Sequence, residues 1–367
     1  MGACALMPNV VDGQGMFVET AEERIERLEQ ELARAKAAAE KETAETASKG
    51  SSVEEDINNI PTGALVIVKG AKGGGGSGFI AKLRGRLFFV TNIHVLAGAR
   101  GAEIRTADGQ SLGLPNYAFL SRNRDLAILP INWTGDYLRV SPSLSFDEVK
   151  IGDAITVMGN SDGVGVATRL HGDIDGLGPD QIEISAKFVP GNSGSPIVHD
   201  KRGTVIGIVS HMRDLSKKTK WTEDSEQPDI RRYGFRMDGE IAWERASLSQ
   251  IFDEGERLKR FEERTQLLTR TIYMLKNRRS IMTGYRQHET LGYLFQPFDD
   301  DFNWNKGLAS SNNVRKLERF VNNLKSELIR DRDSTGNDLK LSFFKSRFLE
   351  FDRVRDYYSE QLKQVSF

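Results

Sequence analysis

The stretch that most clearly suggests chemistry is Val189–Pro196, which reads Val-Pro-Gly-Asn-Ser-Gly-Ser-Pro. Its Ser193 has Gly191 two positions before it and Gly194 directly after it. Glycine permits the backbone angles of a tight turn. Such a turn can point the N–H groups of Gly191 and Ser193 into one small space, where they would stabilise an oxyanion. Asn-Ser-Gly also occurs in ordinary loops, so other residues must distinguish a reactive serine from a plain turn.

A histidine and an aspartate could act together with Ser193. Among the five histidines, His94 follows an apolar strand pattern, a place where a catalytic base is commonly held. Asp125 directly precedes the apolar run 126–129, and a buried carboxylate there needs a partner. The imidazole N–H of His94 is a natural partner, because the pairing would fix the ring tautomer. The order histidine, aspartate, serine is one of the known orders of a Ser-His-Asp triad.

The remaining candidate motifs predict neither a metal site nor a cofactor. His171 and His199 have aspartates close by in the sequence but lack a recognised metal-ligand spacing, and surface loop positions are expected for both. The glycine-rich run 73–78 lacks the Gly-Lys-Ser/Thr ending of a phosphate-binding loop. We therefore expect no bound nucleotide and no metal ion.

Length and composition narrow the class of protein. A chain of 367 residues has room for roughly two domains with appendages. The net charge of −1 gives no general attraction to nucleic acid. The single cysteine, Cys4, excludes an intrachain disulfide. No apolar run approaches the ~20 residues that a membrane-spanning helix needs.

Residues 1–60 are predicted to contain a leader (1–16), a short coiled-coil helix (17–40) and a linker (41–60). Gly2-Ala3-Cys4 resembles the end of a bacterial lipoprotein signal, and the alternative is a chance cysteine in an unstructured terminus. Location therefore stays open between the bacterial cell envelope or periplasm and the cytoplasm. The helix is predicted because apolar residues recur at alternating spacings of three and four, the seam of a coiled coil. They are Val18, Ala21, Ile25, Leu28, Leu32, Ala35 and Ala39. Such a seam favours a homo-oligomer over a solvated single helix.

Residues 61–240 have a β pattern, and residues 241–367 a helical one. Short apolar runs separated by turn residues predict an all-β sandwich or a pair of barrels of roughly 180 residues. Beyond them, apolar residues at helical spacing predict helices over 241–276, 308–329 and 341–365. Basic and acidic residues alternate there, which indicates a solvated surface and not a nucleic-acid site. A protein partner could bind this helical domain.

The β region resembles trypsin-like (chymotrypsin-fold) serine proteases, and among them the HtrA/DegP type. The similar segments surround His94, Asp125 and Ser193 and include the strands on either side. They are Gly76–Ile80, Thr91–Val95, Asp125–Leu129, Ile151–Asp153, Met158–Asn160, Pro190–Pro196 and Tyr233–Met237. The resemblance implies a double six-stranded Greek-key β-barrel. The PDZ peptide-binding domain typical of HtrA proteins is not recognisable in residues 241–367.

The resemblance also implies roles for individual residues. His94 would take the proton of Ser193 and return it to the leaving amine, and Asp125 would orient the imidazole. The N–H groups of Gly191 and Ser193 would form the oxyanion hole. Ser193 is preferred over Ser195 as the nucleophile, because only Ser193 has both glycines correctly spaced.

Specificity is predicted from the residues around the nucleophile. Trypsin-like enzymes that cut after basic residues carry Asp at the sixth position before the serine, which here is Lys187. We therefore expect cleavage after small or medium apolar residues. The residues expected to line the pocket are Phe188, Val189, Ser210, His211 and Met212.

The sequence thus predicts a serine endopeptidase that acts on proteins or peptides through an acyl-enzyme intermediate. The alternative is a catalytically silent trypsin-fold protein that binds peptides or serves as a scaffold.

Overall fold

The computed structural model describes residues 60–71, 74–144, 149–214, 230–276 and 311–363. By contacts the chain divides into two compact units, Met1–Asn59 and Ile60–Phe367, and all the described residues lie in the second. The predicted leader with Cys4, the coiled coil and almost all of the linker lie outside the described residues. They stay predictions.

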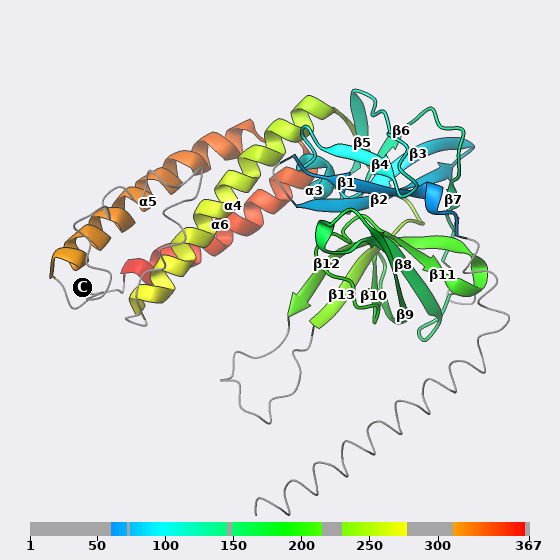
Figure 1. Cartoon of the computed structure of the whole chain (residues 1–367). Helices are drawn as coiled ribbons and strands as arrows, with labels where there is room; N and C mark the ends of the chain where they lie inside the picture. The colour runs from blue at the N-terminus through cyan, green and yellow to red at the C-terminus, as the bar shows by residue number, and fades with distance from the viewer. Residues whose placement is uncertain (1–59, 72–73, 145–148, 215–229, 277–310, 364–367) are drawn as a thin grey trace, which may run out of the picture. The chain divides into compact units, whose positions relative to one another are not determined.

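The first half of the β region forms an eight-stranded sheet (Figure 1). Its strands follow the order β14-β5-β6-β3-β2-β1-β4, and β7 pairs with β2. Their bounds are β1 (Leu65–Lys69), β2 (Gly75–Leu83), β3 (Arg86–Thr91), β4 (Glu103–Thr106), β5 (Tyr117–Ser121), β6 (Ala127–Pro130), β7 (Leu138–Arg139) and β14 (Trp243–Ser247). Its apolar runs form strands because β-branched and aromatic side chains fit a pleated, buried surface.

The second half of the β region closes into a barrel of six strands, in the order β10-β13-β12-β11-β8-β9. Their bounds are β8 (Ala154–Asn160), β9 (Ala167–Leu177), β10 (Gln181–Ile184), β11 (Pro196–His199), β12 (Thr204–Asp214) and β13 (Ile230–Arg236). The inward side chains, among them Ile155, Val157, Ile197 and Val209, form a core of their own. Closure satisfies the hydrogen bonds of every strand edge. This barrel agrees with the six strands that the resemblance implied.

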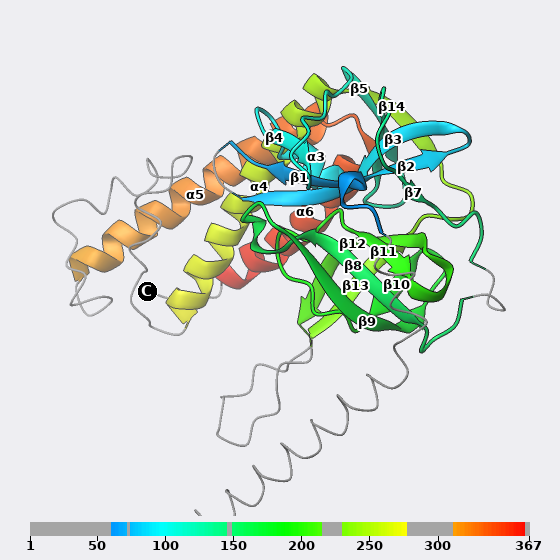
Figure 2. The same ribbon diagram turned by 45° about the vertical axis from the view of Figure 1, so that its right-hand side comes forward.

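The first sheet differs from the six-stranded barrel that was expected. Its ladder is an open path, because β14 adds to the β5 edge through the pairs Trp243–Ser121 to Ser247–Tyr117. Residues 241–247 were predicted as the start of a helix, but Trp243–Ser247 form a strand instead. Figure 2 shows β14 beside β5. The β part of the chain therefore extends past residue 240.

Short helices join the strands. They are the 3₁₀ turns Thr62–Ala64, Ser161–Gly163 and Asp200–Arg202 and the α-helix α3 (Ile93–Ala97). The sequence placed His94 in a loop after a strand, whereas the structure places it in the first turn of α3.

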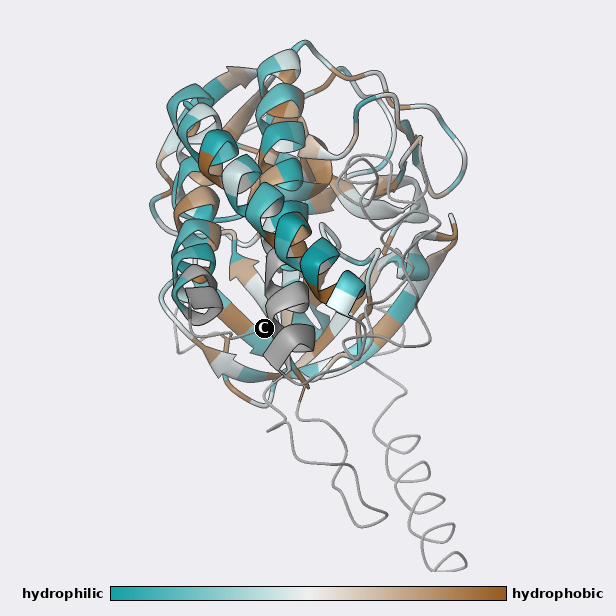
Figure 3. Ribbon diagram, turned by 90° about the vertical axis from the view of Figure 1, so that its left-hand side faces the viewer, coloured by the Kyte–Doolittle hydropathy of each residue, from teal (hydrophilic) through white to brown (hydrophobic). Residues whose placement is uncertain are grey.

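Three long helices follow β14 in the described part of the chain: α4 (Leu248–Lys276), α5 (Ser311–Asp338) and α6 (Ser342–Lys363). The apolar faces of α4 and α6 join the core of the first sheet, where Ile251, Phe261 and Phe344 pack in one cluster with Val66, Phe89 and Leu96. Their outward faces are mostly hydrophilic (Figure 3). The helical region is therefore continuous with the β domain. None of the described helices has the length and apolar character needed to cross a bilayer.

Candidate active site

The first element of the site is a histidine–aspartate pair. Nδ1 of His94 lies 2.5 Å from Oδ2 of Asp125, and the backbone N–H of His94 donates to Oδ1 at 3.1 Å. Asn92, which precedes α3, is buried and donates from Nδ2 to the carbonyl of Asp125 at 2.6 Å. Both carboxylate oxygens are therefore engaged with one residue. The carboxylate holds the ring with its other nitrogen, Nε2, available.

The pairing shifts the pKa of both partners. Burial lowers the pKa of the His94 imidazole, but the charge of Asp125 and its hydrogen bond raise it more, so the pKa lies above the usual value. Burial raises the pKa of Asp125, whereas the charge and the hydrogen bonds of His94 lower it more. The carboxylate therefore stabilises the protonated ring. A base that takes up a proton during a reaction benefits from this arrangement.

The second element is the loop with Ser193. Gly191 and Gly194 have φ angles of +97° and +91°, a region that side chains rarely adopt. A Cβ on Gly194 would lie 2.0 Å from the carbonyl oxygen of Ser77, and one on Gly191 would lie 2.3 Å from that of Asn160. Only glycine fits at either position. The tight turn predicted from the sequence is present.

The N–H groups of this loop divide into two classes. Those of Asn192, Gly194 and Ser195 donate to carbonyl oxygens of the protein. Those of Gly191 and Ser193 donate to no group in the described part of the chain. Ser193 is partly exposed, so its N–H lies near the surface of the loop. Two neighbouring free donors are what an oxyanion site needs.

The side chain of Ser193 hydrogen-bonds a backbone carbonyl. Its hydroxyl donates to the carbonyl oxygen of Ser210 at 3.3 Å, and within the described residues no hydrogen bond joins it to the imidazole. Ser210 nevertheless connects the two elements of the site, because its own hydroxyl lies 3.4 Å from Oδ2 of Asp125. The serine loop and the histidine–aspartate pair therefore meet at one residue of β12.

Ser195 has a different environment from Ser193. It is fully buried, and its hydroxyl has no hydrogen-bond partner in the described chain. A Cβ on Gly159 would lie 1.8 Å from that hydroxyl oxygen, so the strand β8 packs directly on it. A substrate cannot reach Ser195 without opening the barrel.

Ser77 holds the loop in place, and the sequence analysis gave it no role. Its hydroxyl donates to the carbonyl of Gly191 at 2.8 Å and accepts from the N–H of Asn160 at 2.8 Å. Its N–H donates to the carbonyl of Ser193 at 2.8 Å. The only signal in the sequence was a small polar residue between two glycines in a strand.

Arg124 is a second residue that sequence reasoning missed. Its buried guanidinium donates to the carbonyls of Arg236 and Asp238 at 2.6 and 2.9 Å and to Asp180 at 2.8 Å. These partners all belong to the second half of the β region, whereas Arg124 adjoins Asp125 in the first. Arg124 therefore fixes Asp125 against the second barrel.

The residues predicted to line a pocket lie in different surroundings. Phe188 is 2% exposed and packs in the core of the second barrel, while Val189 is half-buried. Ser210 is buried, and Met212 is exposed. His211 stacks on Tyr233, with ring centroids 5.3 Å apart. Of these five residues, Ser210 forms the contact with Ser193, and Phe188 belongs to the core of the second barrel.

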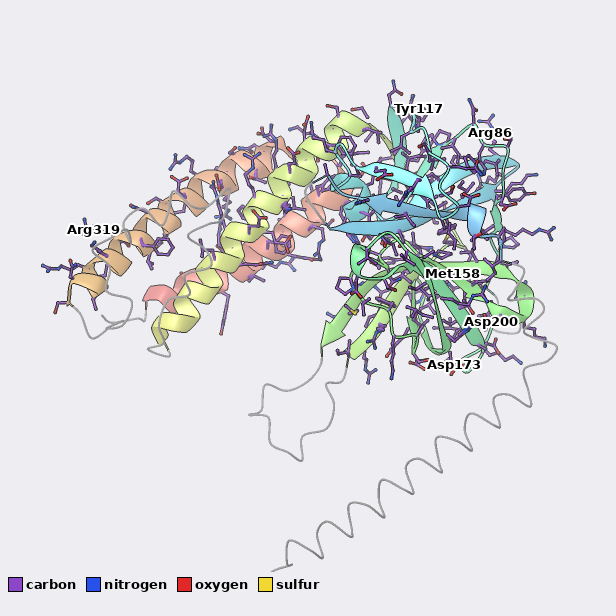
Figure 4. The ribbon with its side chains drawn as sticks, viewed as in Figure 1. Arg86, Tyr117, Met158, Asp173, Asp200 and Arg319 are labelled. Atoms are coloured by element: carbon purple, nitrogen blue, oxygen red, sulfur yellow. The ribbon has the colours of Figure 1, made fainter. Side chains whose placement is uncertain are left out.

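Two other histidines, His171 and His199, lie on strands of the second barrel. No cluster of three or more metal-ligating side chains occurs among the residues that the structure describes. His199 was expected on a surface loop, but it is buried at the end of β11 and bonds Asp153 at 3.1 Å. His171 contacts Thr156. Figure 4 shows the nearby Asp173 and Asp200 on the second barrel.

Known proteins resemble this chain over its β region. Residues 76–208 match the family of the trypsin-like peptidase domain. The uncharacterized protein y4bJ of Sinorhizobium fredii is 36% identical over 173 residues, which are 43% of this chain and 25% of that protein. Protease Do-like 1, chloroplastic, of Arabidopsis thaliana is 32% identical over 146 residues, which are 37% of this chain and 32% of that protein.

Two further comparisons cover the same region. HhoA of Synechocystis is 34% identical over 157 residues, which are 38% of this chain and 37% of that protein. The crystal structure of Deg5 aligns at 25% identity and a TM-score of 0.36, over 44% of this chain and 88% of that one. The chain thus spans between 25% and 37% of the length of the three curated relatives.

The matched region includes all three residues of the site, His94, Asp125 and Ser193. The described residues beyond β14 form the helices α4, α5 and α6, and no PDZ domain occurs among them. Residues 76–208 are therefore a trypsin-like peptidase domain related to the HtrA-type proteases.

Proposed function

We propose that the protein is a serine endopeptidase in which Ser193 attacks the peptide carbonyl. The observation that carries the proposal is the position of Ser210, which contacts the Ser193 hydroxyl with its carbonyl and Asp125 with its hydroxyl. The nucleophile, the base and its orienting carboxylate are therefore neighbours. The buried hydroxyl of Ser195 leaves Ser193 as the serine that a substrate can reach.

In the proposed reaction, Ser193 first rotates from the Ser210 carbonyl to His94. Nε2 of His94 takes the hydroxyl proton as the serine oxygen bonds to the carbonyl carbon, and Asp125 stabilises the imidazolium. The N–H groups of Gly191 and Ser193 hold the oxyanion, an effect worth roughly 3–4 kcal/mol for a donor. His94 then gives the proton to the leaving amine as the carbon–nitrogen bond breaks. A water molecule next attacks the acyl carbon while His94 takes its proton, and His94 returns that proton to the Ser193 oxygen as the ester bond breaks.

A second part of the proposal concerns which side chain the substrate carries before the cleaved bond. The exposed Lys187 leaves the site without the acidic residue that would bind a basic side chain. The apolar surfaces of Val189 and Met212 favour a small or medium apolar residue before the cleaved bond. A peptide library cleaved mainly after Arg or Lys would contradict this specificity.

Labelling by a fluorophosphonate probe tests the nucleophile. Wild type and Ser195→Ala should both label, and Ser193→Ala should not. Ser195→Ala is a matched control, since it removes a hydroxyl two positions away that has no partner. Labelling of Ser193→Ala, or no labelling of folded wild type, would favour the rival role as a silent peptide-binding protein.

A further inference from the structure

The helix that carries His94 rests directly on the first helix of the C-terminal region. α3 lies beside α4 in both Figure 1 and Figure 2. One close approach is between Ala97 and Gly255, where a Cβ on Gly255 would lie 2.6 Å from the Cβ of Ala97 and 3.3 Å from its carbonyl oxygen. Real Cβ atoms do not approach this closely, so the spacing of the two helices depends on glycine at position 255.

A second contact holds the end of α3. Arg100, just beyond the helix, pairs with Asp253 at 2.5 Å and with Glu256 at 3.0 Å, and its guanidinium lies 5.3 Å from the ring centroid of Phe252. These side chains are about half exposed, so a single pair contributes little stability. These contacts instead fix the position of Arg100 relative to α4, because all three partners lie within about one turn of α4, on either side of Gly255.

The buried faces of the same elements share one apolar core. Ile93, Val95 and Leu96 of α3 pack in a single cluster with Ile251 and Leu258 of α4. Leu341, Phe344 and Phe348, at the start of α6, belong to the same cluster. Interiors of this density transmit small displacements instead of absorbing them. A shift of α4 therefore moves α3.

Charged groups of the helices also reach His94. Glu262 of α4 raises the pKa of the His94 imidazole and Arg347 of α6 lowers it, each less than Asp125 does. Arg347 lowers the pKa of His211 as well. Charged groups of both helices therefore lie within electrostatic range of His94, and Arg347 also lies within range of His211.

We propose that Gly255 is a positioning residue. Because it has no side chain, α4 packs closely against α3 and determines the position of α3, and with it the distance from His94 to Ser193. The proposal rests on the proposed function, since it assigns the C-terminal helices a part in that reaction. His94 is fixed to Asp125 on one side, but Ser193 must rotate to meet it. A displacement near 1 Å is enough to cost about 10²-fold in rate.

The test is Gly255→Ala, with Gly336→Ala in α5 as the matched control. Both changes replace a helical glycine and should favour the helix by up to about 1 kcal/mol. At Gly336 the added Cβ meets the ring of Phe348 at 3.1 Å, which calls for a shift of only a few tenths of an ångström, whereas at Gly255 it meets the Cβ of Ala97 at 2.6 Å. We expect Gly255→Ala to lower kcat roughly 10- to 100-fold with KM little changed, and Gly336→Ala to keep wild-type kinetics.

The double variant Gly255→Ala/Ala97→Gly provides the rescue. It removes the Cβ that the new methyl group would meet, so most of the lost kcat should return. Equal kcat for Gly255→Ala and wild type would overturn the proposal. So would an equal loss in Gly336→Ala, or no recovery in the folded double variant.

A readout without turnover separates this proposal from the proposed function. The proton between Nδ1 of His94 and Asp125 should give a low-field NMR signal that moves in Gly255→Ala and not in Gly336→Ala. If folded wild type neither cleaves nor labels, the endopeptidase proposal fails, while a signal that moves in Gly255→Ala alone still supports the positioning role. A signal unchanged in Gly255→Ala contradicts that role.

Discussion

The hydroxyl of Ser193 donates to the carbonyl of Ser210 at 3.3 Å. His94 meanwhile is held by Asp125 through both its ring and its backbone N–H. The proposed base is therefore already oriented, whereas the proposed nucleophile has one rotation still to make. Catalytic hydrogen bonds that are absent from free enzymes commonly form when substrate binds.

The pH dependence of kcat/KM should follow the His94 imidazole. The ring must be neutral to accept the serine proton, so activity falls as the pH drops through its pKa. Because Asp125 raises that pKa above the usual value, the acid limb should lie at a correspondingly high pH. Asp125→Asn should move the limb to lower pH and reduce kcat by roughly 10⁴-fold. An acid limb that stays in place in Asp125→Asn would contradict the assignment of the base.

Glu262 and Arg347 should shift the same limb in opposite directions. Glu262→Gln removes a charge that raises the pKa of His94, so the acid limb should move to lower pH. Arg347→Gln removes a charge that lowers it, so the limb should move to higher pH. Both shifts should shrink as salt is added, because partly exposed charges are screened. Profiles of kcat/KM against pH at two ionic strengths measure these shifts of the acid limb. Shifts of the same sign in the two variants would refute the opposite effects of Glu262 and Arg347 on the pKa of His94.

Ser77→Ala should loosen the nucleophile loop. It leaves the N–H of Asn160 and the carbonyl of Gly191 without their buried partner, a loss of about 1–3 kcal/mol. Ser141→Ala is the control, since it also deletes a buried hydroxyl but one that bonds only the carbonyl of Ser143. We expect kcat to fall in Ser77→Ala and to stay unchanged in Ser141→Ala. Equal kcat in the two variants would argue against a role for Ser77 in holding the loop.

Asp238 should make the fold sensitive to acid. Burial raises the pKa of its carboxyl, but the hydrogen bonds and charge of Arg236 and the N–H of Leu144 lower it more. A depressed folded-state pKa gives stability that is present above the unfolded pKa and is lost as the pH falls through the folded pKa. Denaturant unfolding should therefore show wild type more stable than Asp238→Asn near neutral pH, with the gap closing in acid.

Asp175→Asn supplies a control of opposite sign. Burial and the charge of Asp173 raise the pKa of Asp175, so its ionised form opposes folding. The amide variant should be slightly more stable than wild type near neutral pH, and this difference too should vanish in acid. Equal effects of the two substitutions would contradict the opposite signs of these pKa shifts.

The parts of the molecule that could be predicted from sequence are those with a local pattern. The Gly-Asn-Ser-Gly segment predicted a tight turn, and Gly191 and Gly194 have positive φ angles that suit one. The apolar runs predicted strands, and the helical spacing after residue 248 predicted α4. In each of these cases the periodicity or the glycines of one segment determine its conformation.

The parts that could not be predicted depend on contacts between distant segments. The strand Trp243–Ser247 has three polar residues in five, and it is a strand because it pairs with β5. Ser77 and Arg124 matter through partners far away in the sequence, Gly191 and Asp238. In the sequence Gly255 is only an isolated glycine within a helical pattern, and its close contact with Ala97 of α3 is evident only in the structure.

The place of β14 determines where this protein can be divided. Cutting the chain at residue 240, where the β pattern ends in the sequence, would remove β14 and leave the hydrogen-bonding groups of β5 unpaired. A bare strand of this kind recruits other chains and promotes aggregation. Cutting after residue 247 would keep the strand but expose Ile93 and Leu96, which pack on α4 and α6. We therefore expect that residues 76–208, which match the peptidase domain, do not fold stably on their own. Transferring this domain into another protein would require β14 and the helices α4 and α6 to be included.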